Sequence, residues 1–369
     1  MFRRLLLKNS RGQVLSDIDN YDVLCRLMSN KEPAAELKGK SSVSFDTRAD
    51  GGALDWQEDF SSAKTVVHDL QDGLLGRSQE YLIPVSSLVA SAGPGAFQLE
   101  LWLNDVAKVF CASKHASEVD IGYSITDVAY DLELVELSPE LMTDINTEIS
   151  GGAAIPIPYR AVHSYTNQVA SGSSYKAQIS DMSHDVESVF SVIRKQSQGD
   201  AITADAGDDL KSRSSALDPY RFMGGRLSLG ADNTTGASDA IVTKYSYRYG
   251  SHYYPLSPVN LDVDSTLALE NVISNFELDQ KPPFMAEKLQ TTTKRVPRFE
   301  TDTFVLASNF KTTSDANIRN GLNSSATGAP IELNLSFSAG VTNLTVDTFV
   351  MSTQTLCIKM NGASSLIKD

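Results

Sequence analysis

Residues 97–104 carry the clearest structural pattern of the sequence, Phe97-Gln98-Leu99-Glu100-Leu101-Trp102-Leu103-Asn104. Every second residue is a large apolar one, and the residues between them are Gln98, Glu100 and Trp102. In an extended strand these two sets point to opposite faces. The stretch therefore predicts a half-buried antiparallel strand, with one face on a core and the other towards solvent or a neighbour.

Short strand signals recur on both sides of this stretch. They are rich in Val, Ile, Leu and Tyr and are bounded by clusters of Gly, Asn, Asp and Pro, which is typical of strands joined by turns. In residues 186–194 the apolar pattern fits either a helix or a strand, and the β-branched content favours a strand. The candidate strands are residues 65–70, 81–85, 97–104, 127–137, 156–165, 186–194, 241–250, 304–310, 331–337, 348–351 and 356–359.

Helical spacing is confined to two short segments, residues 20–28 and residues 265–274. Each gathers apolar side chains on one face of a helix, as an amphipathic helix does. These side chains are Val23, Leu24, Leu27 and Met28 in the first segment, and Leu267, Val272 and Ile273 in the second.

Many short strands with few helices indicate β-sandwiches or barrels. One eight-stranded jelly roll takes about 150–180 residues, so a chain of 369 residues has room for two. We therefore predict an all-β fold of two tandem eight-stranded jelly-roll barrels (a double jelly roll) with few short helices. The expected parts are an N-terminal arm with a short helix (1–42), a first jelly roll (43–180) and a second (181–369). The second contains a long surface loop at residues 196–240, which are rich in Gly, Ser, Asp and Ala.

The composition, 41% hydrophobic and 21% charged, is that of a globular protein with real cores. No apolar run approaches the ~20 residues that cross a bilayer, and the N-terminus lacks the apolar stretch of a signal peptide. A net charge of −14 disfavours broad binding to nucleic acid. We therefore expect the sequons at Asn233, Asn323 and Asn343 to reflect the composition of loops rather than glycosylation. We expect Cys25, Cys111 and Cys357 to be buried free thiols in a reducing compartment.

Side chains that carry catalysis or bind metals do not fall into a known spacing. The histidines are scattered, and the sequence has neither a P-loop nor a Gly-x-Ser-x-Gly motif. The acidic cluster of residues 200–209 lacks the EF-hand spacing for Ca²⁺, and two carboxylates across a cleft would suit a glycosidase only if the fold brought them together. We therefore assign no catalytic, cofactor-binding or metal-binding residue and expect a protein that is not an enzyme. The residues weighed are His68, His115, His163, His184 and His252, with the acidic sets Asp181 and Asp185, Asp205, Asp208 and Asp209, and Glu133 and Glu136.

Tyrosines concentrate in residues 245–254 and could stack sugars or bases together with Arg248. Tyr245, Tyr247 and Tyr249 share one face of a strand, where packing in a core or a subunit interface is commoner. We therefore predict packing for these three.

Several segments, taken in order, resemble the double jelly-roll major capsid proteins of icosahedral DNA viruses. That lineage includes tailless phages, polinton-like and adintovirus-type elements, and nucleocytoplasmic large DNA viruses. Position 72 departs from the pattern, because Ser is usual there. The matching segments span residues 63–369: Asp72-Gly73-Leu74-Leu75-Gly76, Tyr81-Leu82-Ile83-Pro84, Leu99-Glu100-Leu101-Trp102-Leu103, Tyr247-Arg248-Tyr249-Gly250-Ser251-His252-Tyr253-Tyr254-Pro255, and the closing strands from residue 304 onward.

The resemblance implies a structural role in the virion capsid, after synthesis in the cytoplasm or nucleus of the host. Three chains with two barrels each would form a pseudo-hexagonal capsomer that tiles an icosahedral shell. Its partners would be other copies of the chain, neighbouring capsomers, and penton and minor capsid proteins, without sequence-specific binding to nucleic acid. The loop at 196–240 would lie outside or between subunits. The basic N-terminal segment would face the lumen, towards an internal membrane or a minor protein, or would pack beneath the barrel; its basic residues are Arg3, Arg4, Lys8 and Arg11.

Three rival functions remain open at the level of sequence. A carbohydrate-binding viral spike or lectin-like β-sandwich would need an aromatic groove, and a β-sandwich enzyme would need a cleft with two carboxylates. A minor or vertex capsid protein would share the fold, but such a protein commonly has one barrel and five-fold symmetry.

Overall fold

The computed structural model of the chain describes its ordered elements and several of the segments that connect them. The described residues are 1–9, 12–29, 65–76, 97–109, 122–131, 135–196, 220, 222–225, 241–262, 265–276, 287–289, 295–297, 299, 303–312, 320–325, 329–358 and 364–367.

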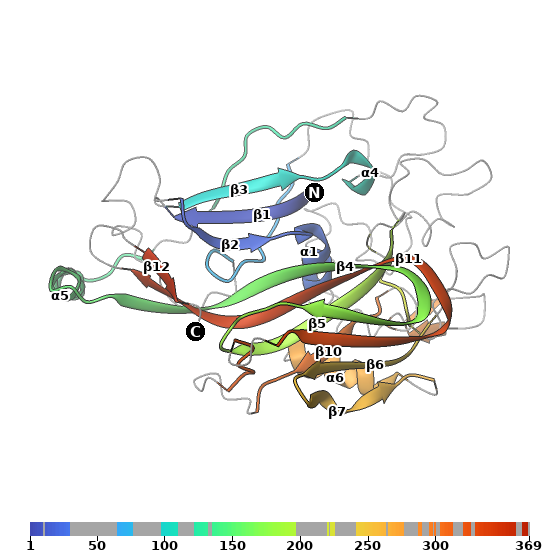
Figure 1. Cartoon of the computed structure of the whole chain (residues 1–369). Helices are drawn as coiled ribbons and strands as arrows, with labels where there is room; N and C mark the ends of the chain where they lie inside the picture. Colours follow the sequence, from blue (N-terminus) through green and yellow to red (C-terminus); the bar gives the residue numbers. More distant parts are fainter. Residues whose placement is uncertain are drawn as a thin grey trace.

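Two long strands, β4 (Ile155–Ile179) and β11 (Ile331–Ile358), form an antiparallel ribbon that organises the fold. The ribbon bends back on itself where its register shifts between Ser336 and Val341 (Figure 1). On the β4 side of the bend, opposite Val341, Gly172 has a φ of +140°, which an L side chain rarely adopts. Because of this bend, each strand takes part in two layers.

The two halves of the ribbon are each extended by two more strands. Leaf A, as we name the first layer, has the order β7 (His252–Asn260), β6 (Val242–Tyr249), first half of β11, second half of β4. Leaf B has the order β10 (Leu306–Asn309), β5 (Val186–Lys195), second half of β11, first half of β4. Two facing four-stranded layers are the architecture of an eight-stranded jelly roll.

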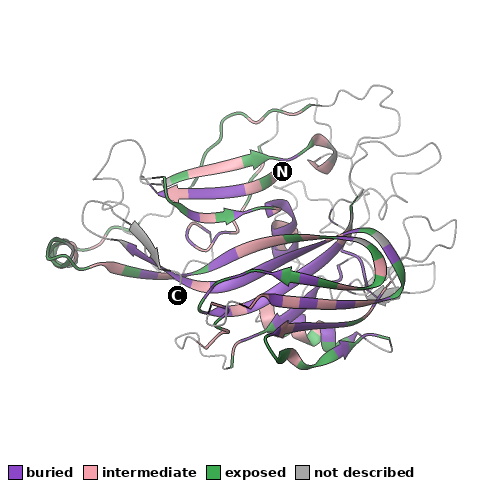
Figure 2. Cartoon of the chain, in the orientation of Figure 1, coloured by how far each residue is buried: buried purple, intermediate pink, exposed green. Residues whose placement is uncertain are grey.

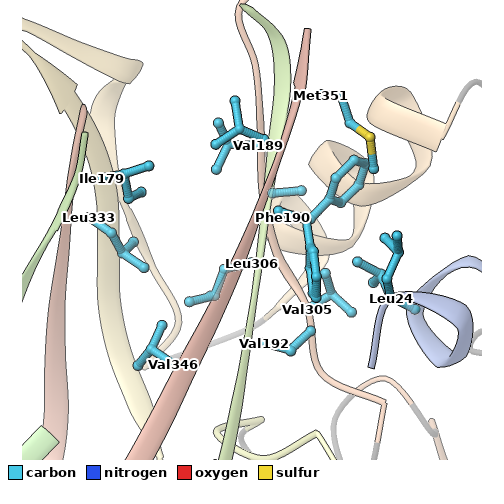
Figure 3. Packing of buried hydrophobic residues seen from close by; sticks show 14 of the residues in the cluster. Leu24, Ile179, Val189, Phe190, Val192, Val305, Leu306, Leu333, Val346 and Met351 are labelled. Carbon is cyan, nitrogen blue, oxygen red and sulfur yellow. The ribbon is translucent and has the colours of Figure 1, made fainter. Parts of the chain in front are cut away.

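Hydrogen bonds and packing show that the two leaves face each other. The hydroxyl of Tyr247 in leaf A donates to Ser191 Oγ of leaf B at 2.9 Å, and Tyr245 donates to the carbonyl of Ala307 at 3.3 Å. Leu333 and Val189 are fully buried between the leaves (Figure 3). The predicted packing of Tyr245, Tyr247 and Tyr249 is therefore confirmed, since all three are buried.

The other face of leaf B is covered by the N-terminal part of the chain. Strands β1 (Phe2–Asn9), β2 (Val14–Ile18) and β3 (Phe97–Leu103) form a separate sheet in the order β2-β1-β3, and helix α1 (Tyr21–Ser29) follows β2. Leu24 of α1 lies on the side of β5 that carries Phe190 and Val192 (Figure 3). Residues 1–29, expected as an arm with one helix, thus form two strands and the predicted helix, packed on the roll (Figure 1).

Burial on both faces explains why the pattern of residues 186–194 was ambiguous. Val189 and Ser191 face leaf A, while Phe190 and Val192 face α1, so that consecutive residues are buried. A strand of this kind shows a nearly continuous apolar run rather than alternation.

Helix α6 (Thr266–Phe276) packs against β10 and confirms the helix predicted at residues 265–274. Its buried residues are Ala268 and Val272, and Phe276 stacks on Phe190 with ring centroids 4.5 Å apart. Leu267, expected on the packed face, is 49% exposed, because it precedes the buried Ala268 by one residue and so lies on the outer side of the helix.

Three predicted strands at the C-terminus, residues 331–337, 348–351 and 356–359, are covered by the single strand β11. The remaining short elements are α4 (Val106–Val109), β8 (Glu287–Leu289), β9 (Arg295–Pro297) and β12 (Ser364–Ile367); β8 pairs with β9, and β12 pairs with β11. Among the described residues, no helix is both long enough and apolar enough to cross a membrane.

Two predicted strands are wrong. Residues 65–70 and the described part of 127–137 are not strands, because neither stretch has a pairing partner in the described part of the chain. Helix α5 (Pro139–Ser150) was not predicted. Residues 81–85 and most of 196–240 lie outside the described residues. Within the latter range, Phe222 and Met223 are buried and bridge to Thr303 and Ile193, so this part is core and not surface loop.

The predicted boundary near residue 180 falls inside the sheet that β4 and β11 share. All of β4 precedes this boundary, yet it pairs with β11 along nearly its whole length. The strands of this roll thus begin at Ile155, before the predicted second domain.

Candidate functional site

The segment from Asp72 to Gly76, quoted above for the resemblance, forms a tight turn against β4. Asp72 Oδ2 accepts the backbone N–H groups of Leu74 at 3.0 Å and Leu75 at 3.1 Å, and Leu74 is fully buried. A Cβ atom on Gly73 would lie 1.9 Å from the carbonyl oxygen of Arg160, so only glycine fits there. The Asp side chain stabilises this turn in the same way as a Ser hydroxyl can, because both accept hydrogen bonds from the backbone N–H groups that follow.

A buried ion pair joins the two strands of leaf B and holds the start of α1. The guanidinium of Arg194 in β5 contacts Asp347 Oδ2 of β11 at 2.6 Å through Nη2 and 2.8 Å through Nε, and the Asp347 side chain is 1% exposed. Asp347 Oδ1 also accepts hydrogen bonds from Asn20 Nδ2 and Thr166 Oγ1, both at 3.0 Å. Each oxygen of this buried carboxylate therefore has partners, as a buried charge requires.

A second buried network links α1 to residues 97–109. Asp22 Oδ2 accepts hydrogen bonds from Asn104 Nδ2 at 2.6 Å and from the hydroxyl of Tyr220 at 2.9 Å. All three side chains are buried. Tyr220 lies in the segment expected to be a surface loop, so part of that segment fastens the N-terminal sheet to the roll.

His163 and Asp181 form the best candidate for acid–base chemistry among the described residues. His163 Nδ1 lies 2.5 Å from Asp181 Oδ1, and its Nε2 lies 2.9 Å from Gln354 Nε2. Burial alone would raise the pKa of Asp181, but His163, the Ser183 N–H and the Tyr165 hydroxyl together hold this pKa below its usual value. His163, Tyr165 and Asp181 line a polar pocket of about 360 Å³ together with Asp17.

The His163 pair is better explained as a structural contact than as a catalytic dyad. Both ring nitrogens face a fixed side chain, so neither is directed at a nucleophile or a free substrate position. Asp181 also accepts the N–H of Ser183 at 3.2 Å, which ties the segment leading into β5 to β4. The network thus holds in place the segment that leads from β4 into β5 of leaf B.

The other weighed histidines and acids are not brought together. His68 lies edge-on to the Phe2 ring, and His184 and His252 are exposed. Asp185 accepts the N–H of Gly321 at 2.7 Å, apart from the Asp181 network. His115, Glu133 and residues 200–209 lie outside the described residues. The described part of the chain holds no group of three His, Cys, Asp or Glu side chains suited to a metal ion.

The remaining candidates take structural positions. Arg4 forms a bidentate pair with Asp17, and Lys8 pairs with Glu100 at 2.6 Å, so two of the N-terminal cations are matched within the chain. Arg3 is exposed, and Arg11 lies outside the described residues. Cys25 and Cys357 are free thiols; Cys25 is half-buried and Cys357 is buried.

Exposed apolar side chains gather in two regions. Neither was assigned as a contact surface from the sequence, although the tyrosines of the second were weighed for stacking. The first is residues 122–150, which include α5 and carry Val128 (75% exposed) and Val135 (58%). The second is the edge strand β7, where Leu256 is 94% exposed and Tyr253 is 40% exposed beneath the guanidinium of Arg248, 5.7 Å from the ring centroid. The strand-like alternation of residues 127–137 was a signal for the first region, since no described strand pairs with its described residues.

Comparison with known proteins relates the chain to viral capsid structures through its fold. No family model matches the sequence, and no curated protein matches it. The protein VP54 of PBCV-1, fitted into a reconstruction of the virophage Sputnik, aligns over 99% of this chain and 83% of its own length, with 8% identity and a TM-score of 0.51.

Two further solved structures give the same picture. A quasi-atomic model of the PBCV-1 virus capsid aligns over 99% of this chain and 83% of its own, with 8% identity and a TM-score of 0.53. The Faustovirus major capsid protein aligns over 98% of this chain and 72% of its own, with 9% identity and a TM-score of 0.52. The chain therefore has the all-β jelly-roll fold of these capsid proteins, as the sequence predicted.

Proposed function

We propose that this chain is a major capsid protein, and that its homotrimers form pseudo-hexagonal capsomers which tile an icosahedral virion shell. The observation that carries the proposal is the agreement of fold over 98–99% of the chain with capsid proteins of large DNA viruses. An alignment of this extent includes both the roll and the N-terminal part of the chain, which supports a capsid role for both parts.

Self-assembly into a trimer follows from the same proposal. In this capsomer the roll and the N-terminal part of each of three chains occupy six positions around a three-fold axis, which match a hexagonal position in a shell. The contact between neighbouring chains is then heterologous and closes by rotation. Further partners in the shell are neighbouring capsomers, penton proteins and minor capsid proteins.

We also propose that the chain acts as a structural protein of the virion and not as an enzyme. The polar networks of the described residues support this, because the carboxylates of Asp347, Asp22 and Asp181 accept hydrogen bonds that hold strands and segments together. An internal membrane, if it contacts the N-terminal segment, meets the exposed Arg3, since Arg4 and Lys8 are paired with carboxylates.

The mass of the purified chain under native conditions tests the proposal. We expect a stable species at three times 40.0 kDa, and electron microscopy of the same sample should show hexagonal blocks. A protein that remains monomeric at high concentration would contradict the proposal. Binding on a glycan array by such a monomer would favour the carbohydrate-binding spike instead, and five-fold assemblies would favour the vertex protein.

A further inference from the structure

The described residues of segment 122–150, which are 122–131 and 135–150, lie at the surface and come between β3 and β4 in the chain. None of its described residues is buried, and helix α5 lies at one end of the molecule (Figure 2). Two of its tyrosines bond to other segments: the hydroxyl of Tyr123 donates to the carbonyl of Asn104 at 2.6 Å, and that of Tyr130 donates to the carbonyl of Leu75 at 2.7 Å. The segment is therefore the least buried long stretch of the described chain.

The sequence of this segment is that of a buried element. Val128 and Tyr130 continue into an alternating strand pattern, and they are 75% and 43% exposed. In α5, Leu141, Met142 and Ile145 recur at helical spacing on one face. A helix of 12 residues is marginal in water by itself, and most helices in proteins are stabilised by packing of their apolar face. In the described part of the chain this face stays unburied, and a second surface would complete its packing.

The charge of the segment restricts what that surface can be. Between residues 127 and 148 there are seven carboxylates and no Lys or Arg, which equals half of the net charge of the chain. The carboxylates are Asp127, Asp131, Glu133, Glu136, Glu140, Asp144 and Glu148. A partner surface must therefore combine positive charge with apolar side chains.

The outer surface of β6 and β7 has this combination. Lys244 is exposed, and Arg248 lies over the half-exposed ring of Tyr253 on the same pair of strands. Next to them Leu256 is 94% exposed on an edge strand. Pro255 and Pro258 deprive this edge of backbone donors, so a partner would dock through side chains rather than extend the sheet.

We propose that residues 122–150 of one copy dock onto the β6–β7 surface of a second copy, with the apolar face of α5 against Leu256 and Tyr253 and its carboxylates near Lys244 and Arg248. This inference rests on the proposed capsomer, whose contacts it assigns. Donor and receiving surfaces are different patches at different places on the chain (Figure 1), so the contact is heterologous, which is the kind of contact that the three-fold ring of the proposed capsomer uses.

Charge reversal in α5 tests the electrostatic half of the proposal. The double variant Asp144→Lys and Glu148→Lys should raise the concentration at which half the chains are trimeric by on the order of tenfold or more, since like charges then face each other. Both residues lie beyond the first turn of α5, so that new lysines do not oppose the helix dipole. Glu270→Lys, an equally exposed change in α6, is the matched control and should leave the trimer unchanged.

Restoration by a second change identifies the receiving surface. Lys244→Glu alone should also weaken the trimer. Combined with the α5 double variant, it should recover a large part of the lost association, because the charges are again opposite. Analytical ultracentrifugation of the four proteins over a concentration series gives the comparison.

Removal of the exposed leucines tests the apolar half. Leu141→Ser and Leu256→Ser should each weaken the trimer without lowering the melting temperature of the monomer, while Leu267→Ser, 49% exposed on α6, should do neither. A wild-type trimer that is insensitive to the charge and leucine variants would overturn this inference and leave the capsomer standing. A wild-type chain that never trimerises would instead remove the proposed function.

Discussion

Strand β5 and residues 127–137 begin from similar sequences and end in opposite environments. Both mix polar residues with large apolar ones, which are Val, Ile and one Phe in β5 and Val, Leu and one Tyr in residues 127–137. In β5 the side chains of Val189 and Phe190 are buried on opposite faces, between leaf A on one side and α1 on the other. In residues 127–137 no described side chain is buried at all.

The difference shows what an apolar pattern specifies. An apolar pattern indicates that one face of the segment must be buried, because burial of apolar area is the main favourable term in folding. It does not state whether the covering surface belongs to the same chain. Strands and a helix from distant parts of the sequence bury β5. We propose that another copy of the chain buries residues 122–150.

Truncation in β5 should have the largest effect. Phe190→Ala should lower the free energy of unfolding by about 3–5 kcal/mol, because it leaves a cavity where the ring stacks on Phe276. Urea denaturation followed by circular dichroism measures the change. If Phe190→Ala costs less than 1 kcal/mol, the ring of Phe190 is not tightly packed on leaf B, and the contrast with residues 127–137 is lost.

Loss of the buried carboxylate of β11 should come next. Asp347→Ala leaves the Arg194 guanidinium without its partner in a site where the arginine side chain is 11% exposed. Breaking such a pair from one side costs about 3 kcal/mol or more. The double variant Asp347→Ala with Arg194→Leu removes the stranded charge and should recover part of the loss in the same urea titration. A double variant less stable than Asp347→Ala alone would show that the Arg194 side chain stabilises the fold even when Asp347 is absent.

Local patterns predicted the strands that have one solvent-exposed face and the two helices whose apolar residues recur at helical spacing. β6, β3, α1 and α6 were found because neighbouring residues within each segment specify them. The continuity of β11 could not be found in this way, since Gly340 and the polar residues near its bend are typical of a turn. There the partner strand β4 keeps the chain extended, and such pairing is invisible to a local pattern.

The buried polar networks were also beyond the sequence. Asp347 and Asn20 are 327 positions apart, and Asp22 and Tyr220 are 198 apart. Such residues look like ordinary surface side chains until the fold brings them together. Residues 65–70 were predicted as a strand for the opposite reason, because their β-branched content is strand-like, although no described strand lies beside them.

The network that leads into β5 should give a smaller, pH-dependent effect. The pKa of Asp181 is lower in the folded chain than its ordinary value of 3.8. Its contribution is therefore present above pH 3.8 and is lost as the pH falls towards the lower folded value. Asp181→Asn should cost about 1.5–3 kcal/mol at neutral pH and should flatten the loss of stability below pH 4. Melting temperatures from pH 3 to 7 measure this, and an unchanged acid profile would show that Asp181 is not the responsible carboxylate.

Substitution in the exposed segment should have the smallest effect on the isolated chain. Val135→Ser removes a side chain that is 58% exposed, so the free energy of unfolding of the monomer should change by no more than about 0.5 kcal/mol. Denaturation below the concentration at which trimers form measures this value, and sedimentation above that concentration measures association. We expect association to weaken while the monomer is unaffected. A destabilised monomer would mean that the segment is covered within its own chain, and the contrast with β5 would then be one of degree only.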